Sequence, residues 1–311
     1  MERAGSGGNI GSILDRGFGM LKKRLRSMAL YIIFAVLGTY LTLAAVLFVF
    51  QSHFVYFPQR ELISSPHDVG LRYDAIRLKT DDGLELNAWF VPVEKPRGVV
   101  LFCHGNAGNM ADRMQAIQIL AKLNLSTFIF DYRGFGKSEG KTSEKGTYLD
   151  AVAAWDYLVQ NRGIDPDRII ILGESLGGAV AAWLAQEHKP AGLIIESSFT
   201  SLPDVAADLY PFFPVRAMLR FSYNTADYLS RVESPVLIVH SCDDDIIPFA
   251  HGCQLYDVAR APKEFLEIRG DHNTGFIMSG ESYVEGIDAF VSKYLKGKPD
   301  ARRSSGRDHA G

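Results

Sequence analysis

Residues 168–188 read RIIILGESLGGAVAAWLAQEH and join a short apolar run to an alanine-rich run. The first run, 168–172, has the β-branched composition and the length of a strand buried on both faces, whereas 176–188 has the composition of a helix. Between them, GESLG (173–177) matches the pattern G-x-S-x-G. This arrangement predicts a strand, a tight turn and a helix, with Ser175 at the tip of the turn.

Ser175 is therefore a candidate nucleophile, presented above the edge of the sheet. A turn this tight needs small neighbours, which Gly173 and Gly177 supply, and Gly178 allows close packing of the following helix. The N-terminus of that helix favours negative charge that develops beside the serine. The alternative is a glycine-rich turn whose serine is incidental.

A serine hydroxyl is a weak nucleophile and needs a histidine base that is oriented by an acid. In hydrolases with this turn, the acid and then the histidine follow later strands. After the apolar run at 236–239 come three adjacent aspartates, Asp243, Asp244 and Asp245. After the next strand-like run comes His272, which is the candidate base. Chain order alone leaves the choice among the three aspartates open.

An earlier loop, which follows the apolar run 98–103, carries a further set of polar residues. It reads HGNAGN (104–109). Acyl transfer through a tetrahedral intermediate needs two N–H donors aimed at the oxyanion. The backbone N–H groups of Leu176 and Asn106 are the candidates, and His104 is interpreted as a residue that braces the loop.

A zinc site is the alternative interpretation of these loops. It would use Cys103, His104, His240 and Cys242. Their positions do not follow the spacing of zinc motifs, and none of the three cysteines stands in a C-x-x-C array. The sequence therefore implies no metal and no other cofactor.

Around these motifs, residues 60–296 alternate between strand-like and helix-like runs. Such alternation is typical of an α/β fold with a mostly parallel sheet and helices on both faces. A hairpin is expected near the start, with strands at 73–79 and 84–91. Residues 199–230, which are rich in proline and aromatic residues, interrupt the alternation and are interpreted as a short helical lid. The further expected strands are 98–103, 126–130, 168–172, 193–195, 236–239 and 265–268, and the expected helices are 109–123, 148–160, 176–188 and 284–294.

Residues 28–50 form an almost wholly apolar run of 23 residues. As a helix, this run spans about 34 Å, which is enough to cross a bilayer. Four basic residues shortly precede it and no charge follows before Arg60, so the positive-inside rule places the N-terminus in the cytoplasm and the remaining domain on the other side. A cleaved signal peptide is disfavoured by the length of the run and by its poor cleavage site, and a buried soluble helix would need polar breaks.

The segments that flank the apolar run differ in character. FVYFP (54–58) is aromatic, and we interpret it either as a segment at the membrane interface or as ordinary core residues. Residues 1–27 are rich in Gly and Ser, contain six basic and two acidic residues, and are expected to be disordered. The polar tail 297–311 is expected to be disordered as well.

The overall composition limits the class of protein. The 311 residues are 47% hydrophobic and 22% charged, which excludes a wholly disordered chain, a collagen-like fibre and a disulfide miniprotein. A formal net charge of −3 gives no positive field that would point to nucleic acid. The N-terminal 27 residues carry a net charge of +4, so the rest of the chain is acidic.

Through these motifs, residues 60–296 resemble the serine α/β-hydrolases. The similarity is to the membrane-anchored, short-lid branch of the abhydrolase-domain-containing proteins, and it lies in HGNAGN (104–109), DYRGFGKSEG (131–140), GESLGG (173–178), FTSLPDVAADLYPFFPVR (199–216) and GDHN (270–273).

The family pattern H-G-x-x-D-x-x-x-P maps onto residues 240–248 and selects Asp244. Ser241 stands where the family usually has Gly, so Asp243 and Asp245 stay open. The resemblance implies a triad and an oxyanion hole formed by Ser175, Asp244 and His272, with Asn106 and Leu176.

The function that this resemblance implies is a membrane-tethered serine hydrolase. Members of the branch include esterases and thioesterases, so the expected partners are a small-molecule or lipid-like acyl substrate and the membrane. An amidase or peptidase uses the same triad, and a non-catalytic binding module shares the fold, so both stay as alternatives. A dehalogenase or epoxide hydrolase is disfavoured because Ser175 stands where its aspartate nucleophile would be.

Overall fold

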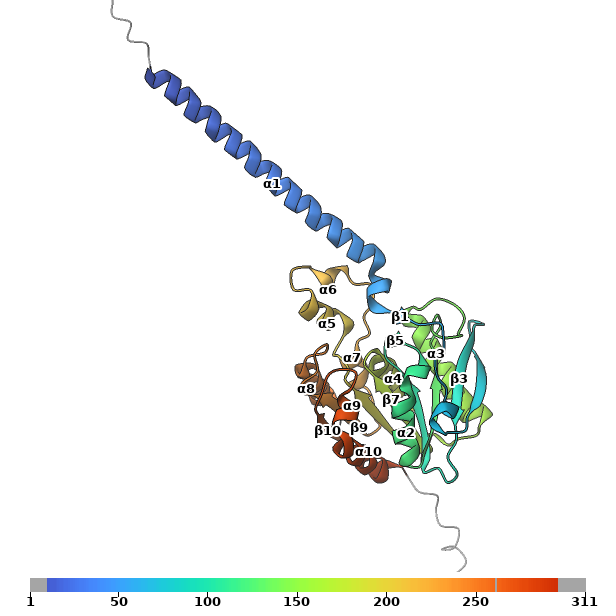
Figure 1. Ribbon diagram of the computed structural model, residues 1–311. Coiled ribbons are helices and arrows are strands. Elements are labelled where there is room, and N and C mark those ends of the chain that lie inside the picture. Colours follow the sequence, from blue (N-terminus) through green and yellow to red (C-terminus); the bar gives the residue numbers. More distant parts are fainter. Residues whose placement is uncertain (1–9, 261, 296–311) are drawn as a thin grey trace, which may run out of the picture. The chain divides into compact units, whose positions relative to one another are not determined.

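The computed structural model describes residues 10–260 and 262–295 (Figure 1). The chain divides into two compact units, Met1–Gln51 and Ser52–Gly311. Helix α1 (Ile10–Val55) makes up the described part of the first unit, and its last turn belongs to the second. The second unit holds the sheet and all of the predicted functional residues.

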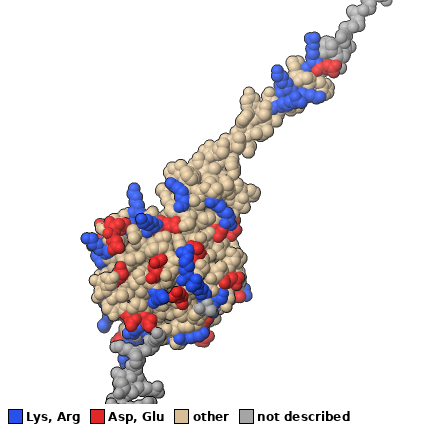
Figure 2. All heavy atoms as spheres, turned by 180° about the vertical axis from the view of Figure 1, so that it is seen from behind, with Lys and Arg blue, Asp and Glu red and all other residues tan. Residues whose placement is uncertain are grey.

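Helix α1 is long and apolar enough to cross a membrane over Asp15–Val55. Figure 2 shows Lys and Arg side chains gathered toward one end of it and no charged side chain along the rest. Because α1 begins at Ile10, the expectation that residues 10–27 are disordered is wrong. Lys, Arg and Leu extend a helix that the apolar run has already nucleated, so no second nucleation cost arises. Residues 1–9 and 297–311, also expected to be disordered, lie outside the described residues.

The second unit is built on an eight-stranded sheet with the order β10-β9-β8-β7-β4-β6-β3-β2. The pairs β2–β3 and β3–β6 are antiparallel, and the other pairs are parallel, which confirms the predicted α/β architecture. A separate parallel pair joins β1 to β5. The strands are β1 (Phe57–Pro58), β2 (Asp74–Lys79), β3 (Glu85–Val91), β4 (Gly98–Cys103), β5 (Ala107–Gly108), β6 (Leu125–Phe130), β7 (Ile169–Glu174), β8 (Gly192–Glu196), β9 (Val236–Ser241) and β10 (Lys263–Ile268).

Two hydrophobic cores cover the two faces of the sheet. Within β4, Leu101 contributes to the core that contains residues of α3, α4 and α8, whereas Phe102 contributes to the core that contains residues of α2 and α10. The strands read as continuous apolar runs because both of their faces are covered in this way. These helices are α2 (Met114–Lys122), α3 (Glu144–Asp156), α4 (Leu176–Glu187), α8 (Phe249–Val258) and α10 (Gly280–Tyr294), with the short α9 (Gly275–Met278) before the last.

Shorter helical turns connect these elements. The 3₁₀ turn η2 leads into α2, and η3, a π-helical turn, extends α3 at its end. The bounds are η1 (Pro66–Val69), η2 (Met110–Arg113), η3 (Tyr157–Asn161) and η4 (Pro166–Arg168).

Residues 199–230 form an insert between β8 and β9. It contains α5 (Leu202–Leu209), α6 (Val215–Met218) and α7 (Thr225–Leu229). The Ser201 hydroxyl begins α5 by accepting a hydrogen bond from the Asp204 N–H. Because the insert follows the carboxyl end of β8, it starts at the edge where open α/β sheets bind ligands.

Candidate active site

Ser175 occupies the turn between β7 and α4. Its backbone (φ 53°, ψ −119°) lies in a region that costs free energy for any residue other than glycine. A Cβ at Gly177 would lie 2.0 Å from the Cys103 carbonyl oxygen, and one at Gly173 would lie 2.4 Å from the Gly177 carbonyl oxygen. The turn is therefore packed so closely that the two predicted glycines have no larger replacement.

Two hydrogen bonds hold the backbone of Ser175 in this conformation. Its N–H donates to the Glu196 carbonyl at 2.9 Å, and the Ser198 hydroxyl donates to the Ser175 carbonyl at 2.8 Å. Both partners lie at the end of β8, the neighbouring strand. The Gly178 N–H, within the turn, also donates to the Ser175 carbonyl at 2.9 Å. The strained turn is thus fixed both by the end of the adjacent strand and by its own residues.

The structure brings Ser175, His272 and Asp244 together from three separate loops. His272 Nε2 lies 3.0 Å from Ser175 Oγ, and His272 Nδ1 lies 2.8 Å from Asp244 Oδ2. All three side chains are largely buried. The distances are those of a base placed between a nucleophile and the acid that orients it.

The three adjacent aspartates have different surroundings. Asp244 Oδ1 accepts the N–H groups of Ile246 and Ile247, which leaves Oδ2 directed at His272. Asp245 instead accepts the backbone N–H of His272 at 3.1 Å, and Asp243 lies 3.6 Å from an arginine side chain. Only Asp244 contacts the imidazole ring among these three.

Asp244 is kept in its charged form by its contacts. Burial by itself would raise the pKa of this carboxyl. The hydrogen bond and charge of His272, together with the N–H groups of Ile247 and Ile246, outweigh burial and lower the pKa below its usual value. A charged carboxylate favours the tautomer in which Nδ1 carries hydrogen, so that Nε2 is free to accept the serine proton.

The loop 104–109 passes directly beside the serine. A Cβ at Gly105 would lie 3.6 Å from Ser175 Cβ. Within the described part of the chain, neither the Asn106 N–H nor the Leu176 N–H has a protein hydrogen-bond partner. Two backbone donors are therefore unoccupied next to Ser175, as an oxyanion hole requires.

His104 is fully buried and contacts the loop itself. Its Nδ1 lies 2.8 Å from the Gly105 carbonyl oxygen, and its Nε2 lies 3.5 Å from Asp131 Oδ1.

The alternative zinc site would need the thiolate of Cys103. Burial raises the pKa of this thiol to about 12. Among the described residues, no group of three or more His, Cys, Asp or Glu side chains could hold a metal ion.

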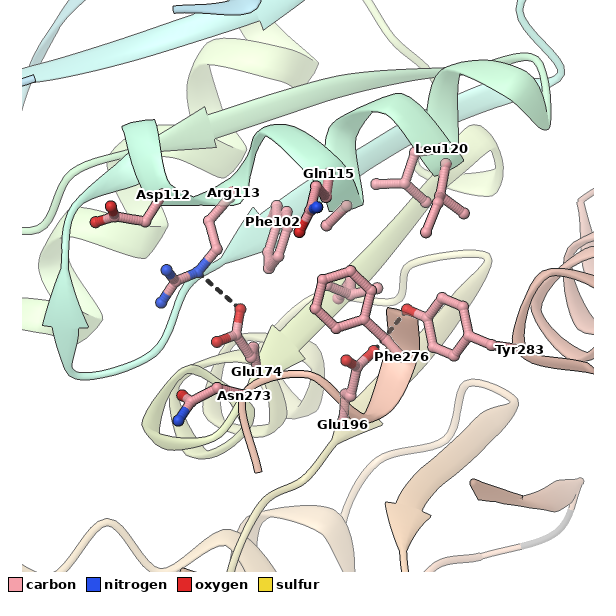
Figure 3. A pocket seen from close by; sticks show the side chains of 13 residues that line it. Phe102, Asp112, Arg113, Gln115, Leu120, Glu174, Glu196, Asn273, Phe276 and Tyr283 are labelled. Atoms are coloured by element: carbon pink, nitrogen blue, oxygen red, sulfur yellow. Dashed lines mark hydrogen bonds and ion pairs between the residues drawn. The ribbon is translucent and has the colours of Figure 1, made fainter. Parts of the chain in front are cut away.

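A cavity of about 160 Å³ lies beside the turn and was not predicted from any motif (Figure 3). Its lining includes Glu174 and Asn273, the chain neighbours of Ser175 and His272. Figure 3 shows Arg113 directed at Glu174, with an Nε–Oε2 distance of 2.8 Å. Because Arg113 lies in η2, this ion pair joins the segment that follows the loop 104–109 to the turn.

The same cavity contains a buried carboxyl group, Glu196. The Tyr283 hydroxyl donates to Glu196 Oε2 at 2.7 Å. Burial raises the pKa of Glu196 from 4.5 to about 7, with a smaller raising effect of Glu174, while Tyr283, His272 and Arg113 act in the opposite direction. Below about pH 7, a protonated carboxyl therefore lines the cavity beside the turn that holds Ser175.

The chain is similar in sequence to known proteins. The Hydrolase_4 family model, described as "Serine aminopeptidase, S33", matches residues 94–218. "Alpha/beta hydrolase domain-containing protein WAV2" of Arabidopsis thaliana is 35% identical over 288 residues, which cover 83% of this chain and 94% of that protein. "Uncharacterized protein Rv2307c" of Mycobacterium tuberculosis is 34% identical over 279 residues, which cover 88% of this chain and 98% of that protein.

A solved structure has the same fold at lower sequence identity. The esterase Pf2001 of Pyrococcus furiosus superposes with a TM-score of 0.66 at 21% identity, over 77% of this chain and 100% of that one.

Proposed function

This chain belongs to the α/β-hydrolase superfamily, and on that premise we propose that it is a membrane-anchored serine hydrolase of carboxylic esters or thioesters. The observation that carries the proposal is the hydrogen-bonded row from Asp244 through His272 to Ser175, with distances of 2.8 and 3.0 Å. The unoccupied N–H groups of Asn106 and Leu176 support it.

In the first half of the proposed reaction, Ser175 Oγ attacks the acyl carbonyl carbon while His272 Nε2 accepts the hydroxyl proton. The carbonyl oxygen becomes an oxyanion and accepts hydrogen bonds from Asn106 and Leu176. Asp244 stabilises the imidazolium that forms. The intermediate then collapses to an acyl-enzyme as His272 donates its proton to the departing alkoxide or thiolate.

In the second half, water replaces the leaving group. His272 removes a proton from water, the resulting hydroxide attacks the acyl carbon, and the same two N–H groups stabilise the second oxyanion. Collapse breaks the bond to Ser175 Oγ, and His272 returns the proton to the serine. The products are a carboxylic acid and free enzyme, with no cofactor involved.

Apolar side chains in the insert support an acyl or lipid-like substrate. Leu209, Tyr210 and Phe212 are all exposed, and Phe212 is 86% exposed. Together with the apolar helix α1, they favour a substrate with an apolar chain held near a membrane. In this proposal the insert is the lid, which meets the acyl chain.

Membrane attachment through residues 28–50, with the N-terminus in the cytoplasm, is part of the proposal. Basic residues precede this run, and no basic residue follows it before Arg60, which supports the orientation. Protease protection in intact vesicles tests it. Digestion of the hydrolase unit from the cytoplasmic side alone would reverse the proposed orientation.

Labelling by a fluorophosphonate probe tests the nucleophile. Membranes containing the wild-type chain should label covalently, whereas Ser175→Ala should not, because the probe reacts with an activated serine. Equal labelling of the two proteins would overturn the enzyme assignment and favour a non-catalytic module.

An amidase or aminopeptidase is the second candidate, favoured by the description of the family model that matches residues 94–218. Comparison of a p-nitrophenyl ester, its thioester and an aminoacyl anilide separates the candidates. We expect the ester and thioester to have the higher kcat/KM. A higher kcat/KM for the anilide would favour an amidase or aminopeptidase instead.

A further inference from the structure

The short segment Val55–Gln59, here called the bridging segment, connects the end of α1 to the hydrolase unit. It runs alongside the oxyanion loop 104–109. The Phe57 N–H donates to the Asn106 carbonyl at 2.9 Å, and the Gln59 N–H donates to the Gly108 carbonyl at 3.0 Å. These bonds form the parallel pair of β1 with β5.

Asn106 contacts the bridging segment by its side chain as well. Its Nδ2 donates to the Val55 carbonyl at 2.7 Å. The last carbonyl groups of a helix have no partner within the helix, so the Asn106 amide satisfies one of them at the end of α1. The carbonyl and the side chain of Asn106 are thus both held by the bridging segment, and its N–H remains for the substrate.

Further hydrogen bonds hold the end of the bridging segment. The Gln59 carbonyl accepts hydrogen bonds from the Gly136 N–H at 2.8 Å and from Asn109 Nδ2 at 3.2 Å. Arg60 donates to the Ser138 carbonyl at 2.7 Å. The loop that follows β6 therefore fixes the position from which this segment contacts Asn106.

Tyr56 connects the bridging segment to the insert. Its side chain is buried, and its hydroxyl lies 2.8 Å from the Tyr223 hydroxyl. Its ring packs edge-on against Phe221 with a centroid distance of 5.5 Å. One residue of the segment is therefore a core residue shared with the insert, whereas the neighbouring Phe57 side chain is 52% exposed.

We infer that the bridging segment positions the oxyanion hole: it orients the Asn106 N–H through its hydrogen bonds to the carbonyl and the side chain of that residue. This inference rests on the proposed function, because it takes the Asn106 N–H as an oxyanion donor. An oxyanion donor acts in the transition state more than in the ground state. Disturbing the segment should therefore lower kcat and leave KM nearly unchanged.

The experiment uses the full chain in detergent micelles with a short-chain p-nitrophenyl ester. Asn106→Ala removes the bond to Val55 but keeps the backbone N–H, and Phe57→Pro removes the N–H that donates to Asn106. For both variants we expect kcat to fall at least about tenfold, with KM within twofold of wild type. Phe57→Ala is the matched control, because it keeps the N–H and removes an exposed ring, and its kcat should stay within twofold.

Thermal unfolding shows whether each variant is folded. If Phe57→Pro is not folded, the kcat of Asn106→Ala alone decides the test. A kcat of folded Asn106→Ala within twofold of wild type would overturn the inference while leaving the proposed function intact. A rise in KM at constant kcat would overturn it as well. A wild-type chain that neither hydrolyses the ester nor labels at Ser175 would overturn the proposed function and this inference together.

Discussion

The turn that holds Ser175 (173–178) and the insert (199–230) follow neighbouring strands of one sheet, yet they are packed in opposite ways. In the turn, a methyl group at Gly177 would lie 2.0 Å from a backbone oxygen. In the insert, Leu209 and Tyr210 are 53% and 42% exposed. The comparison indicates that the groups proposed to react are held by close backbone contacts, whereas the residues proposed to meet the substrate have room to vary.

The largest effect is expected on kcat, from a change of the acid that orients His272 toward the turn. Asp244→Asn should lower kcat by roughly 10⁴-fold, because an amide does not hold the required histidine tautomer as a carboxylate does. Steady-state kinetics of a p-nitrophenyl ester measure it. Asp243→Asn is the control and should retain activity close to wild type. A large loss of kcat in Asp243→Asn, with little loss in Asp244→Asn, would show that Asp243 and not Asp244 is the acid.

The next effect is on packing of the turn. Gly177→Ala places a methyl group against the Cys103 and His104 carbonyl oxygens, which are backbone atoms. We expect the free energy of unfolding to fall by about 3 kcal/mol or more. Gly275→Ala, whose Cβ would meet the end of the Ile268 side chain at 3.2 Å, should cost much less. Denaturant unfolding of both variants measures the difference. An equal loss in the free energy of unfolding would contradict the claim that the turn is packed unusually closely.

A third prediction concerns Glu196 beside the turn. Because burial raises its pKa from 4.5 to about 7, the folded state binds a proton more tightly than the unfolded state. This contribution to stability is complete below pH 4.5 and is lost as pH rises through 7, with a size on the order of 3 kcal/mol. Glu196→Gln should remove this fall in stability.

Unfolding of wild type and Glu196→Gln between pH 4 and 8 measures the effect. Asp150, whose pKa burial raises to about 6, is common to both proteins, so its contribution cancels in the difference. A stability difference that does not vary with pH would show that Glu196 does not bind the proton.

The smallest effect is expected in the insert. Leu209→Gln replaces an exposed side chain with one of similar helix propensity, so the free energy of unfolding should change by less than about 0.5 kcal/mol. The kcat/KM for long-chain esters should fall about threefold, while that for short-chain esters stays constant. A loss of stability comparable to that of Gly177→Ala would remove the contrast between the two regions.

Some parts of the site could be predicted because their signal is local. The turn at Ser175 has its strand, glycines and helix within 21 residues, and His272 follows the last strand in the expected order. Chain order left three adjacent carboxylates open, and the family pattern selected Asp244 although Ser241 departs from that pattern. The path of their loop decides, since it turns only Asp244 toward the imidazole ring.

Contacts between segments that are distant in the chain could not be predicted, because they leave no local pattern in the sequence. The hydrogen bonds of Asn106 with Val55 and Phe57 use mainly backbone groups, which every residue carries, and they span about 50 positions of the chain. The ion pair of Arg113 with Glu174 and the buried pair of Glu196 with Tyr283 likewise depend on which strands become neighbours.

Local sequence was sufficient for the strands of the main sheet, for helices α2, α3, α4 and α10, for the apolar helix, and for the places of Ser175 in its turn and His272 after the last strand, because periodicity and steric limits act between near neighbours. Helices α8 and α9 and the pair of β1 with β5 were not predicted. It was insufficient for residues 10–27, whose helix is an extension of the run beside them. The tertiary structure showed that Asp244 is the aspartate that contacts His272, and it alone decided what holds the loop 104–109 and which carboxyl is buried. Those outcomes depend on contacts and desolvation that arise only when separate segments pack together.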